Sequence, residues 1–382
     1  MVACLLGKAR AGNWMGRLPD ATYVAVVSIP GAHDAATGCG WAEGMDDLGD
    51  AFARTQELSL AQLWSEGVRA FDLRPCAHEG YLNVNHGLVA TKLRFDEALF
   101  LLRDSLAANP TEFVVIHMLH ETDGDQTDDF GQQLLSLLGS DELKDVLVDF
   151  KPNLTVGEMR GKMLLLSRDK YADTPATGGF FENWTGEVNW SKQSQGRIKG
   201  PKLSGKCYMQ DYSDTHQQGG IDTKLKGLKL LLNFSSSHAT TDASSIVWVV
   251  NLASAYSLVE SLFGYELSLS DGYRDNATYT HAAILEHLAQ PDRKPGPTGI
   301  VLMDYAGIDK SGNYEVRGKE TVRAIIDNNF RYLDDASAGV RPATLSGQPA
   351  YYSLRGQQLS TPRRGEVNLV RQTDCSIKKA RF

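Results

Sequence analysis

The sequence predicts an α/β fold, namely a (β/α)₈ TIM-type barrel that is distorted or incompletely closed. Short apolar runs alternate with amphipathic stretches over roughly the first 330 of the 382 residues, and this alternation is typical of a mainly parallel sheet. Eight runs predict strands, the number that a barrel of this type requires. In chain order they are Val24–Ile29, Val68–Leu73, Leu82–Asn85, Phe113–Met118, Met163–Ser167, Cys207–Gln210, Ile246–Leu252 and Gly299–Met303.

Amphipathic stretches between these runs predict helices that cover the sheet. Examples are Leu93–Ala108, Phe130–Leu138, Lys224–Leu232 and Ala255–Phe263. Two of the eight strand patterns, those around Leu82 and Cys207, are weak. A doubly wound open sheet is therefore the structural alternative to the barrel.

The bulk properties exclude several classes of protein. The composition is 42% hydrophobic and 23% charged, as in ordinary globular proteins, and the net charge of −8 argues against a dedicated nucleic-acid binder. No stretch approaches about 18 uninterrupted apolar residues, so we expect no membrane span. The five cysteines have no metal-binding spacing, which favours free thiols.

Three regions are expected along the chain. Residues 1–335 form the barrel, residues 336–350 are rich in Ala, Ser, Gly and Pro and predict a linker, and residues 351–382 form a short basic module. This last region holds seven Arg and Lys against two acidic residues. Such a basic end could contact anionic lipid, but a solvated surface is the simpler interpretation.

Polar residues follow the predicted strands at their carboxyl ends. The first such group is Ser28–Asp34, where Pro and Gly end a strand and a His–Asp pair follows. In a parallel barrel, the carboxyl ends of the strands form the catalytic rim. Seven residues are expected there: His33, Asp34, Arg74, His86, Arg168, Asp211 and Asp304.

These residue types suit phosphoryl transfer. Two histidines with carboxylate partners provide a general base and a general acid. Arg74 provides a fixed cation for the charge that builds on the phosphorus oxygens in the transition state. A metal would require acidic or amide ligands where the chain has Arg74, so the pattern favours a site without a metal cofactor.

Three ordered motifs carry a family resemblance: Ser28–Asp34, Gly67–Arg74 and Asn85–Gly87. They resemble the X-region of bacterial phosphatidylinositol-specific phospholipase C. The order and approximate spacing agree over roughly residues 14–330. The agreement includes Leu164–Arg168 and Gly299–Tyr305.

The resemblance implies a role for each catalytic candidate. His33 is the general base that deprotonates the inositol 2-hydroxyl, and Asp304 orients it. Arg74 binds the phosphate in place of calcium. His86 is the general acid that protonates the leaving diacylglycerol oxygen, with Asp34 as its partner. The implied products are diacylglycerol and inositol 1,2-cyclic phosphate.

The resemblance also implies that Arg168 and Asp211 hold inositol hydroxyls, and that Tyr212 and Trp184 lie beside the headgroup. For Arg168 and Asp211 the alternative is a structural ion pair, and for Trp184 ordinary packing. The family often has a lysine after the fourth strand, where this chain reads Ile116–Glu121 and offers His117 or His120 instead. Trp41 or Phe52 could insert into lipid, with packing as the alternative.

The expected enzyme is a metal-independent phosphatidylinositol phospholipase C, a lyase that acts as a monomer on phosphatidylinositol or a GPI-type lipid at a membrane surface. The alternatives are a barrel phosphodiesterase for glycerophosphodiesters or sphingolipids, and a lipid-binding module without catalysis. No export signal is visible at the N-terminus. The lipid substrate and a C-terminal segment that resembles a module of exported proteins favour secretion or the cell envelope.

Overall fold

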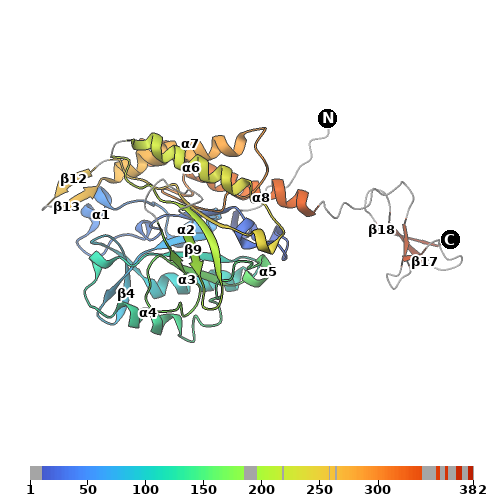
Figure 1. The fold of residues 1–382 in the computed structure, drawn as a ribbon, viewed down its shortest axis with the longest axis horizontal. Coiled ribbons are helices and arrows are strands. Elements are labelled where there is room, and N and C mark those ends of the chain that lie inside the picture. Colours follow the sequence, from blue (N-terminus) through green and yellow to red (C-terminus); the bar gives the residue numbers. More distant parts are fainter. Residues whose placement is uncertain are drawn as a thin grey trace. The chain divides into compact units, whose positions relative to one another are not determined.

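The computed structural model describes residues 11–184, 196–216, 219–257, 259–262, 265–337, 350–352, 358–359, 367–371 and 377–381. The chain divides into two units, Met1–Tyr332 and Leu333–Phe382. Figure 1 shows the helices and strands of both units.

The first unit is built on a closed barrel. Around the barrel, the described strands follow the order β1, β14, β11, β10, β9, β8, β7, β6 and β2. Their bounds are β1 Ile29–Ala32, β2 Ala70–Leu73, β6 Val114–Met118, β7 Met163–Ser167, β8 Gly179–Glu182, β9 Gly196–Lys199, β10 Ser204–Gln210, β11 Trp248–Leu252 and β14 Ile300–Met303. The predicted TIM-type α/β fold is confirmed, and the barrel is closed.

The barrel is distorted on one side. There β9 runs antiparallel to both of its neighbours, β8 and β10, whereas the other described pairs of the barrel are parallel. Close approach of the strands also constrains β1, where a Cβ on Gly31 would lie 2.6 Å from the side chain of Leu302. A glycine is therefore needed where β1 packs against β14.

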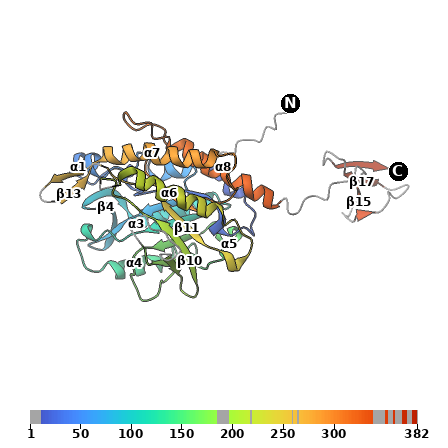
Figure 2. The ribbon, with the colours of Figure 1, turned by 45° about the horizontal axis from the view of Figure 1, so that its top comes forward.

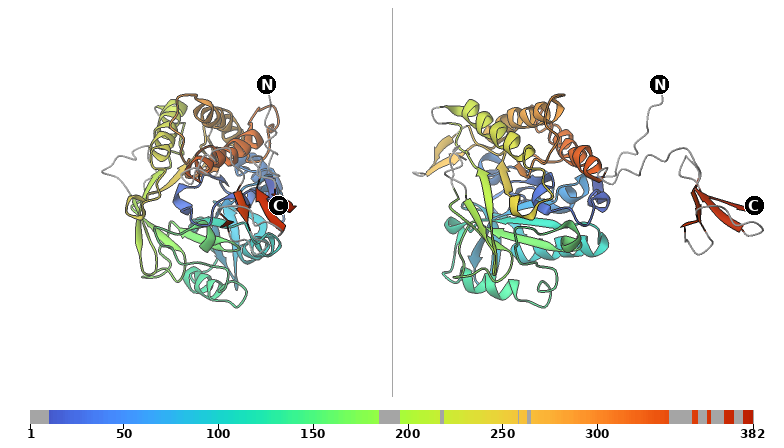
Figure 3. Two further views of the ribbon diagram at one scale, coloured as in Figure 1. Left: turned by 90° about the vertical axis from the view of Figure 1, so that its right-hand side faces the viewer. Right: turned by 45° about the vertical axis from the view of Figure 1, so that its right-hand side comes forward.

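Helices surround the barrel. They are α1 Asp46–Phe52, α2 Leu60–Glu66, α3 Phe95–Ala108, α4 Phe130–Leu138, α5 Val156–Met159, α6 Gly220–Ser236, α7 Ser270–Ala289 and α8 Gly318–Ser337. In Figures 1 and 2, α6, α7 and α8 lie along one flank of the barrel. The left view of Figure 3 shows the green α4 on the opposite flank. The core lies within this shell, where strand side chains such as Phe71, Ile116 and Leu165 are fully buried.

Three predicted elements differ from the structure. Val24–Val26 forms a buried 3-10 turn, and the strand begins at Ile29. Leu82–Asn85 is a strand, within β4 Tyr81–His86, but it lies outside the barrel in a sheet with β3 Pro75–His78 and β5 Val89–Arg94. The stretch predicted as a helix over Ala255–Phe263 contains the strand β12, Val259–Leu262. A short apolar run is compatible with the periodicity of either a helix or a strand. In these three segments, pairing and packing with the rest of the protein determine which structure forms.

Two smaller sheets complete the description. In the first unit, β12 Val259–Leu262 pairs antiparallel with β13 Tyr265–Ser268. In the second unit, the strands follow the order β16, β15, β17 and β18, with bounds β15 Ala350–Tyr352, β16 Gln358–Leu359, β17 Val367–Arg371 and β18 Ile377–Arg381. Most of the predicted linker lies outside the described residues.

Within the described part of the chain, no helix combines the length and the apolar character needed to cross a bilayer. Cys39, Cys76 and Cys207 are free thiols.

Candidate active site

The ends of β1 and β14 bring together one histidine and one carboxylate. Nδ1 of His33 lies 2.8 Å from Oδ1 of Asp304. The side-chain amide of Gln56 donates to the carbonyl oxygens of His33 and Met303, at 2.8 and 2.7 Å, and so holds the two strand ends together. Burial raises the pKa of Asp304 well above its ordinary value. A hydrogen bond from His33 therefore stabilises a carboxylate that is otherwise costly to ionise.

The neighbouring arginine determines which nitrogen of His33 carries the proton. Nη2 of Arg74 lies 2.7 Å from Nε2 of His33. Because a guanidinium can only donate, Nε2 is the acceptor and the single proton of the neutral ring sits on Nδ1, facing Asp304. Burial and the charge of Arg74 hold the pKa of His33 well below 6.5. His33 is therefore neutral, with its basic nitrogen in the site.

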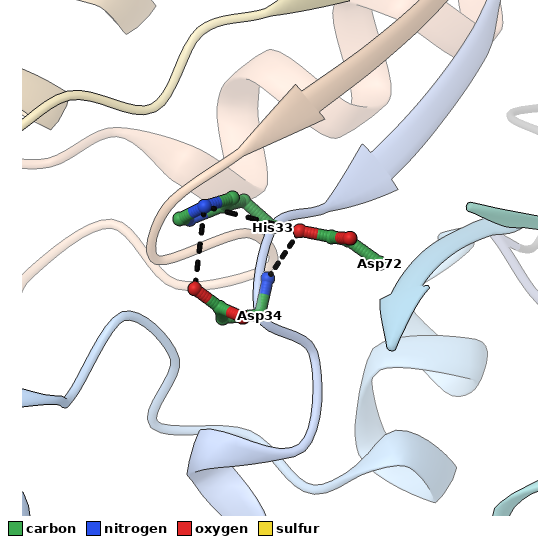
Figure 4. Close-up of side chains that lie close together, drawn as sticks. All are labelled: His33, Asp34 and Asp72. Carbon is green, nitrogen blue, oxygen red and sulfur yellow. Dashed lines mark hydrogen bonds and ion pairs between the residues drawn. The ribbon is translucent and has the colours of Figure 1, made fainter. Parts of the chain in front are cut away.

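Asp34 lies between the two histidines. Its φ of 41° is in the left-handed region, which is uncommon for a residue other than glycine, and its backbone N–H donates to Oδ2 of Asp72 at 3.2 Å. Oδ2 of Asp34 lies 3.3 Å from Nε2 of His33 and 3.6 Å from Nε2 of His86. Burial raises the pKa of Asp34 to about 7, against the opposing charge of Arg74. Figure 4 shows His33, Asp34 and Asp72 converging.

His86, at the end of β4, is held on its other side. Its Nδ1 lies 2.7 Å from the carbonyl oxygen of Ala53, so Nδ1 carries a proton and donates. Nε2 faces Asp34 and lies 3.4 Å from the hydroxyl of Tyr273. Burial and the charge of Arg74 lower the pKa of His86 to about 4. Since the pKa of the neighbouring carboxyl is raised, one proton can be held by either member of the His86–Asp34 pair.

Arg74 is surrounded by carboxylates. Its Nε lies 2.8 Å from Oδ1 of Asp34, in an ion pair that is not aligned as a hydrogen bond. Nη2 lies 3.2 Å from Oδ2 of Asp72, and Nη1 lies 3.8 Å from Oε2 of Glu121. Although burial opposes its charge, Asp34 and Asp72 raise the pKa of Arg74. The residue is therefore a permanent cation in the centre of the site.

Three of these groups could also hold a metal ion, because ligand atoms of His33, Asp34 and Asp72 lie within 4.8 Å of one another. The guanidinium of Arg74 contacts each of the three, at 2.7, 2.8 and 3.2 Å respectively. A divalent cation on the same atoms would lie about 2.0–2.6 Å from each of them. It would compete with the guanidinium for the same ligands and be repelled by its charge. The residues present therefore fit an arginine better than a metal.

A second group lies beyond β7 and β10. Nη1 of Arg168 lies 3.2 Å from Oδ2 of Asp211, and Nε1 of Trp184 donates to the same oxygen at 2.9 Å. The guanidinium of Arg168 lies over the indole ring, 4.4 Å from its centroid. The structure thus brings together three of the four predicted substrate-binding residues. We refer to Arg168, Trp184 and Asp211 as the headgroup cluster, after the role that the family resemblance implies for them.

Tyr212 is the fourth predicted substrate-binding residue, and the hydrogen bonds described for it are made by its backbone. Its N–H is bonded to Gln210, and its carbonyl oxygen accepts from Nζ of Lys224 at 2.7 Å. Lys224 is fully buried and also donates to the carbonyl oxygen of Leu252 at 2.6 Å. Burial lowers its pKa to about 8. Lys224 therefore fixes the loop that presents Asp211.

The histidines considered as substitutes for the family's lysine occupy different places. Nδ1 of His117 is bonded to Oδ1 of Asp72 at 2.7 Å, next to Arg74. His120 is instead paired with Asp125 at 2.8 Å, and its ring is stacked on Phe130 with the centroids 3.5 Å apart. Only His117 contacts a group that itself contacts Arg74.

Trp41 does not reach a lipid surface. Only 1% of it is exposed, and its Nε1 donates to Asp50 at 2.7 Å. The idea that this side chain inserts into lipid is therefore wrong, because its indole packs beneath α1. Phe52, the other candidate, is half-buried on α1.

Sequence reasoning missed several residues of the site. A signal existed for Asp72, since it lies near the end of β2 and precedes Arg74 by two positions, and residues two apart in an extended chain share a face. Tyr273 and Lys224 lie in the helices α7 and α6, away from any strand end. Nothing in the local sequence pattern marks them. Their roles follow from how the two helices pack against the barrel.

The chain is similar in sequence to proteins of one name, although no model of a protein family matches it. A 1-phosphatidylinositol phosphodiesterase of Staphylococcus aureus strain Newman is 27% identical over 326 residues, which cover 83% of this chain and 94% of the relative. The protein of the same name from Listeria monocytogenes is 30% identical over 162 residues, 41% of this chain and 49% of the relative.

Solved structures agree in fold. A variant of the phosphatidylinositol-specific phospholipase C of S. aureus has a TM-score of 0.65 at 23% identity, covering 84% of this chain and 97% of that one. The enzyme of that name from L. monocytogenes has a TM-score of 0.60 at 22% identity, covering 84% and 99%. The resemblance seen in the three sequence motifs is confirmed: the chain is a relative, in sequence and in fold, of the bacterial phosphatidylinositol-specific phospholipases C.

Proposed function

We propose that this protein is an enzyme, a phosphatidylinositol phospholipase C that releases diacylglycerol and forms inositol 1,2-cyclic phosphate. One observation carries the proposal. His33 is neutral and is bonded to both Asp304 and the Arg74 cation, and the ring of His86 lies 6.5 Å from that of His33, next to Asp34, whose pKa is raised. Cleavage of a phosphodiester by a neighbouring hydroxyl needs a base, an acid and a cation in such an arrangement.

In the proposed reaction, Nε2 of His33 takes the proton of the inositol 2-hydroxyl. The oxygen attacks phosphorus, and the bond between phosphorus and the glycerol oxygen breaks. The His86–Asp34 pair supplies one proton to that leaving oxygen. Arg74 stabilises the charge on the phosphate oxygens, and the attack gains from being intramolecular. The proton taken by His33 balances the one given by the acid pair.

Resting contacts suggest how the base becomes available. In the free site, Nη2 of Arg74 donates to the same nitrogen of His33 that must accept the hydroxyl proton. A phosphate group offers Arg74 a more strongly charged acceptor than an imidazole nitrogen does. Substrate binding would therefore draw the guanidinium away and expose Nε2. The reaction as proposed uses no metal, because Arg74 already supplies the positive charge.

We also propose how the protein binds its substrate, where it acts and how its chain is organised. The headgroup cluster would bind inositol hydroxyls, and Tyr212 would lie beside it. The substrate would be phosphatidylinositol or a GPI-type lipid, reached by a secreted or envelope-associated monomer through peripheral contact with a membrane. Residues 1–335 would form the catalytic unit, followed by a linker and a basic C-terminal module.

Phosphorus NMR of the reaction with phosphatidylinositol vesicles, in excess chelator, tests the function. We expect the cyclic phosphate resonance from the wild type and none from His33→Ala. Loss of activity in chelator that calcium restores would contradict the metal-free mechanism. Faster headgroup release from phosphatidylcholine or lysolipid than from phosphatidylinositol would favour a different phosphodiesterase. Vesicle binding without turnover would favour a non-catalytic lipid-binding module.

A further inference from the structure

His117 is a buried histidine that the proposed reaction does not use. It lies on β6 in register with Asp72 on β2, and its Nδ1 is bonded to that carboxylate at 2.7 Å. Only 3% of its side chain is exposed. Because Asp72 also contacts Arg74, at 3.2 Å, His117 lies one residue away from the phosphate-binding cation.

The other ring nitrogen of His117 is unusual. Its Nε2 is buried and has no hydrogen-bond partner among the described residues. In the tautomer whose Nδ1 donates to the carboxylate of Asp72, Nε2 carries a lone pair and accepts. Buried polar atoms in folded proteins are rarely left unpaired, and such an atom in a binding site calls for a missing partner.

The position of the ring indicates where the partner would lie. Nε2 belongs to the edge of the imidazole that lies farthest from the backbone of β6. The ring centroid lies 5.2 Å from that of Trp184 and 5.7 Å from that of Phe181. Trp184 in turn donates to Asp211 and lies under Arg168. His117 thus lies between Asp72, which contacts Arg74, and Trp184 of the headgroup cluster.

We propose that Nε2 of His117 accepts a hydrogen bond from a hydroxyl group of the inositol headgroup, and that this contact helps to select inositol lipids. The proposal rests on the proposed function and adds a specificity residue to it. A choline headgroup has no hydrogen-bond donor to offer this nitrogen, whereas inositol presents a hydroxyl on each free ring carbon. Rejection of a substrate that leaves a buried polar group unpaired is an efficient source of specificity.

The test compares His117→Asn with the wild type. The asparagine amide can keep the bond to Asp72 in the place of Nδ1, while the acceptor Nε2 is removed. The substrates are phosphatidylinositol and analogues that each lack one of the non-reacting headgroup hydroxyls. We expect kcat/KM for phosphatidylinositol to fall by about tenfold. For one deoxy analogue, the variant and the wild type should be equally active, because the partner hydroxyl is already absent.

A matched control is His78→Asn. His78 also has a buried Nε2 without a partner among the described residues, but it lies on β3, bonded to Tyr81 and away from the barrel. It should leave the substrate series unchanged. Equal losses on every substrate with His117→Asn, or no loss on any, would overturn the proposal and assign His117 a structural role.

A second measurement does not depend on the variant being folded. In ¹⁵N NMR of the histidine rings of the wild type, myo-inositol should shift the Nε2 resonance assigned to His117 while the Nδ1 resonance of the same ring stays unchanged. If no such resonance moves at saturating myo-inositol, the proposal fails. Absence of any activity of the wild type toward phosphatidylinositol would instead overturn the proposed function, so the two failures are distinguishable.

Discussion

The two histidines of the site are held in opposite ways. Both ring nitrogens of His33 have close partners, Asp304 at 2.8 Å and Arg74 at 2.7 Å. His86 is held closely only at Nδ1, by a backbone carbonyl at 2.7 Å. Among the described residues, the polar partners given for its Nε2 are Tyr273 at 3.4 Å and Asp34 at 3.6 Å. We call these the base half and the acid half of the site.

This difference matches what each half has to do. A general base needs one defined tautomer, with its lone pair in the site from the start. A general acid must hold a proton and then release it to the substrate, so close bonds at the donating nitrogen would hinder it. The base half is accordingly a fixed arrangement of charges, and the acid half is a pair that shares one proton. Changes in the two halves should therefore have different consequences.

The largest effect is expected from Asp304→Asn in the base half. An asparagine favours a proton on Nδ1 less than a carboxylate does, and it cannot stabilise the imidazolium that forms when His33 takes the hydroxyl proton. Loss of the carboxylate behind a catalytic histidine costs about 10³- to 10⁴-fold in kcat. Steady-state kinetics on phosphatidylinositol vesicles measures it. Asp125→Asn, which alters the His120–Asp125 pair at 2.8 Å outside the site, is the control and should stay within about twofold.

In the acid half, His86→Ala should lower kcat by about 10²- to 10³-fold on phosphatidylinositol. The alkoxide of diacylglycerol is a poor leaving group and needs the proton. With an aryl ester of inositol phosphate, whose phenolate leaves without help, the same variant should retain most of the wild-type rate. A similar loss on both substrates would show that His86 does not act as the acid. Asp304→Asn should be impaired on both, which separates the two halves.

The halves also predict the pH dependence. His33 must be neutral, and because its pKa lies well below 6.5, activity should fall on the acid side only well below that pH. The acid pair must hold its proton, and the pKa of about 7 for Asp34 means that this proton is lost as the pH rises through 7. Above that point kcat/KM should fall about tenfold per pH unit. A profile that is flat from about pH 5 to 8 would contradict the two-histidine scheme.

Much of the barrel could be predicted from sequence because its strands are apolar runs that end in Gly, Pro or polar residues. β2, β6 and β7 were placed within two residues of their bounds. The distorted side of the barrel could not be predicted, because β8 and β9 are short segments and the antiparallel pairing of β9 depends on its neighbours. Burial of Val24–Val26 in a 3-10 turn shows the same limit: an apolar pattern predicts burial better than it predicts backbone geometry.

The site residues that could be predicted from the sequence are those at strand ends, such as His33, Arg74 and Asp304. Their meeting follows from the closure of a parallel barrel. Residues that shape the acid half come from elsewhere. Ala53 follows α1 and contributes a carbonyl oxygen to His86, and Tyr273 lies in α7. Contacts made by a backbone atom or by a docked helix leave no mark in a local pattern, so the acid half was incompletely predicted.

Tyr273 offers the smallest but most specific test of the acid half. Burial raises the pKa of its hydroxyl, so the group stays protonated, and at 3.4 Å it is the described side-chain group nearest to Nε2 of His86. A hydroxyl can donate to this nitrogen only while the ring is neutral, so the contact competes with protonation. Tyr273→Phe should therefore raise the pKa of the acid pair and move the alkaline limb upward. The change in kcat near neutral pH should be about two- to fivefold, as expected for one long, neutral hydrogen bond.

Tyr279→Phe is the control: this residue lies on the same helix but is 49% exposed, so the variant should leave both the rate and the alkaline limb of the pH profile unchanged. If Tyr273→Phe instead shifts the acid limb, the hydroxyl acts on the base half, and the separation of the site into two independently held histidines is wrong.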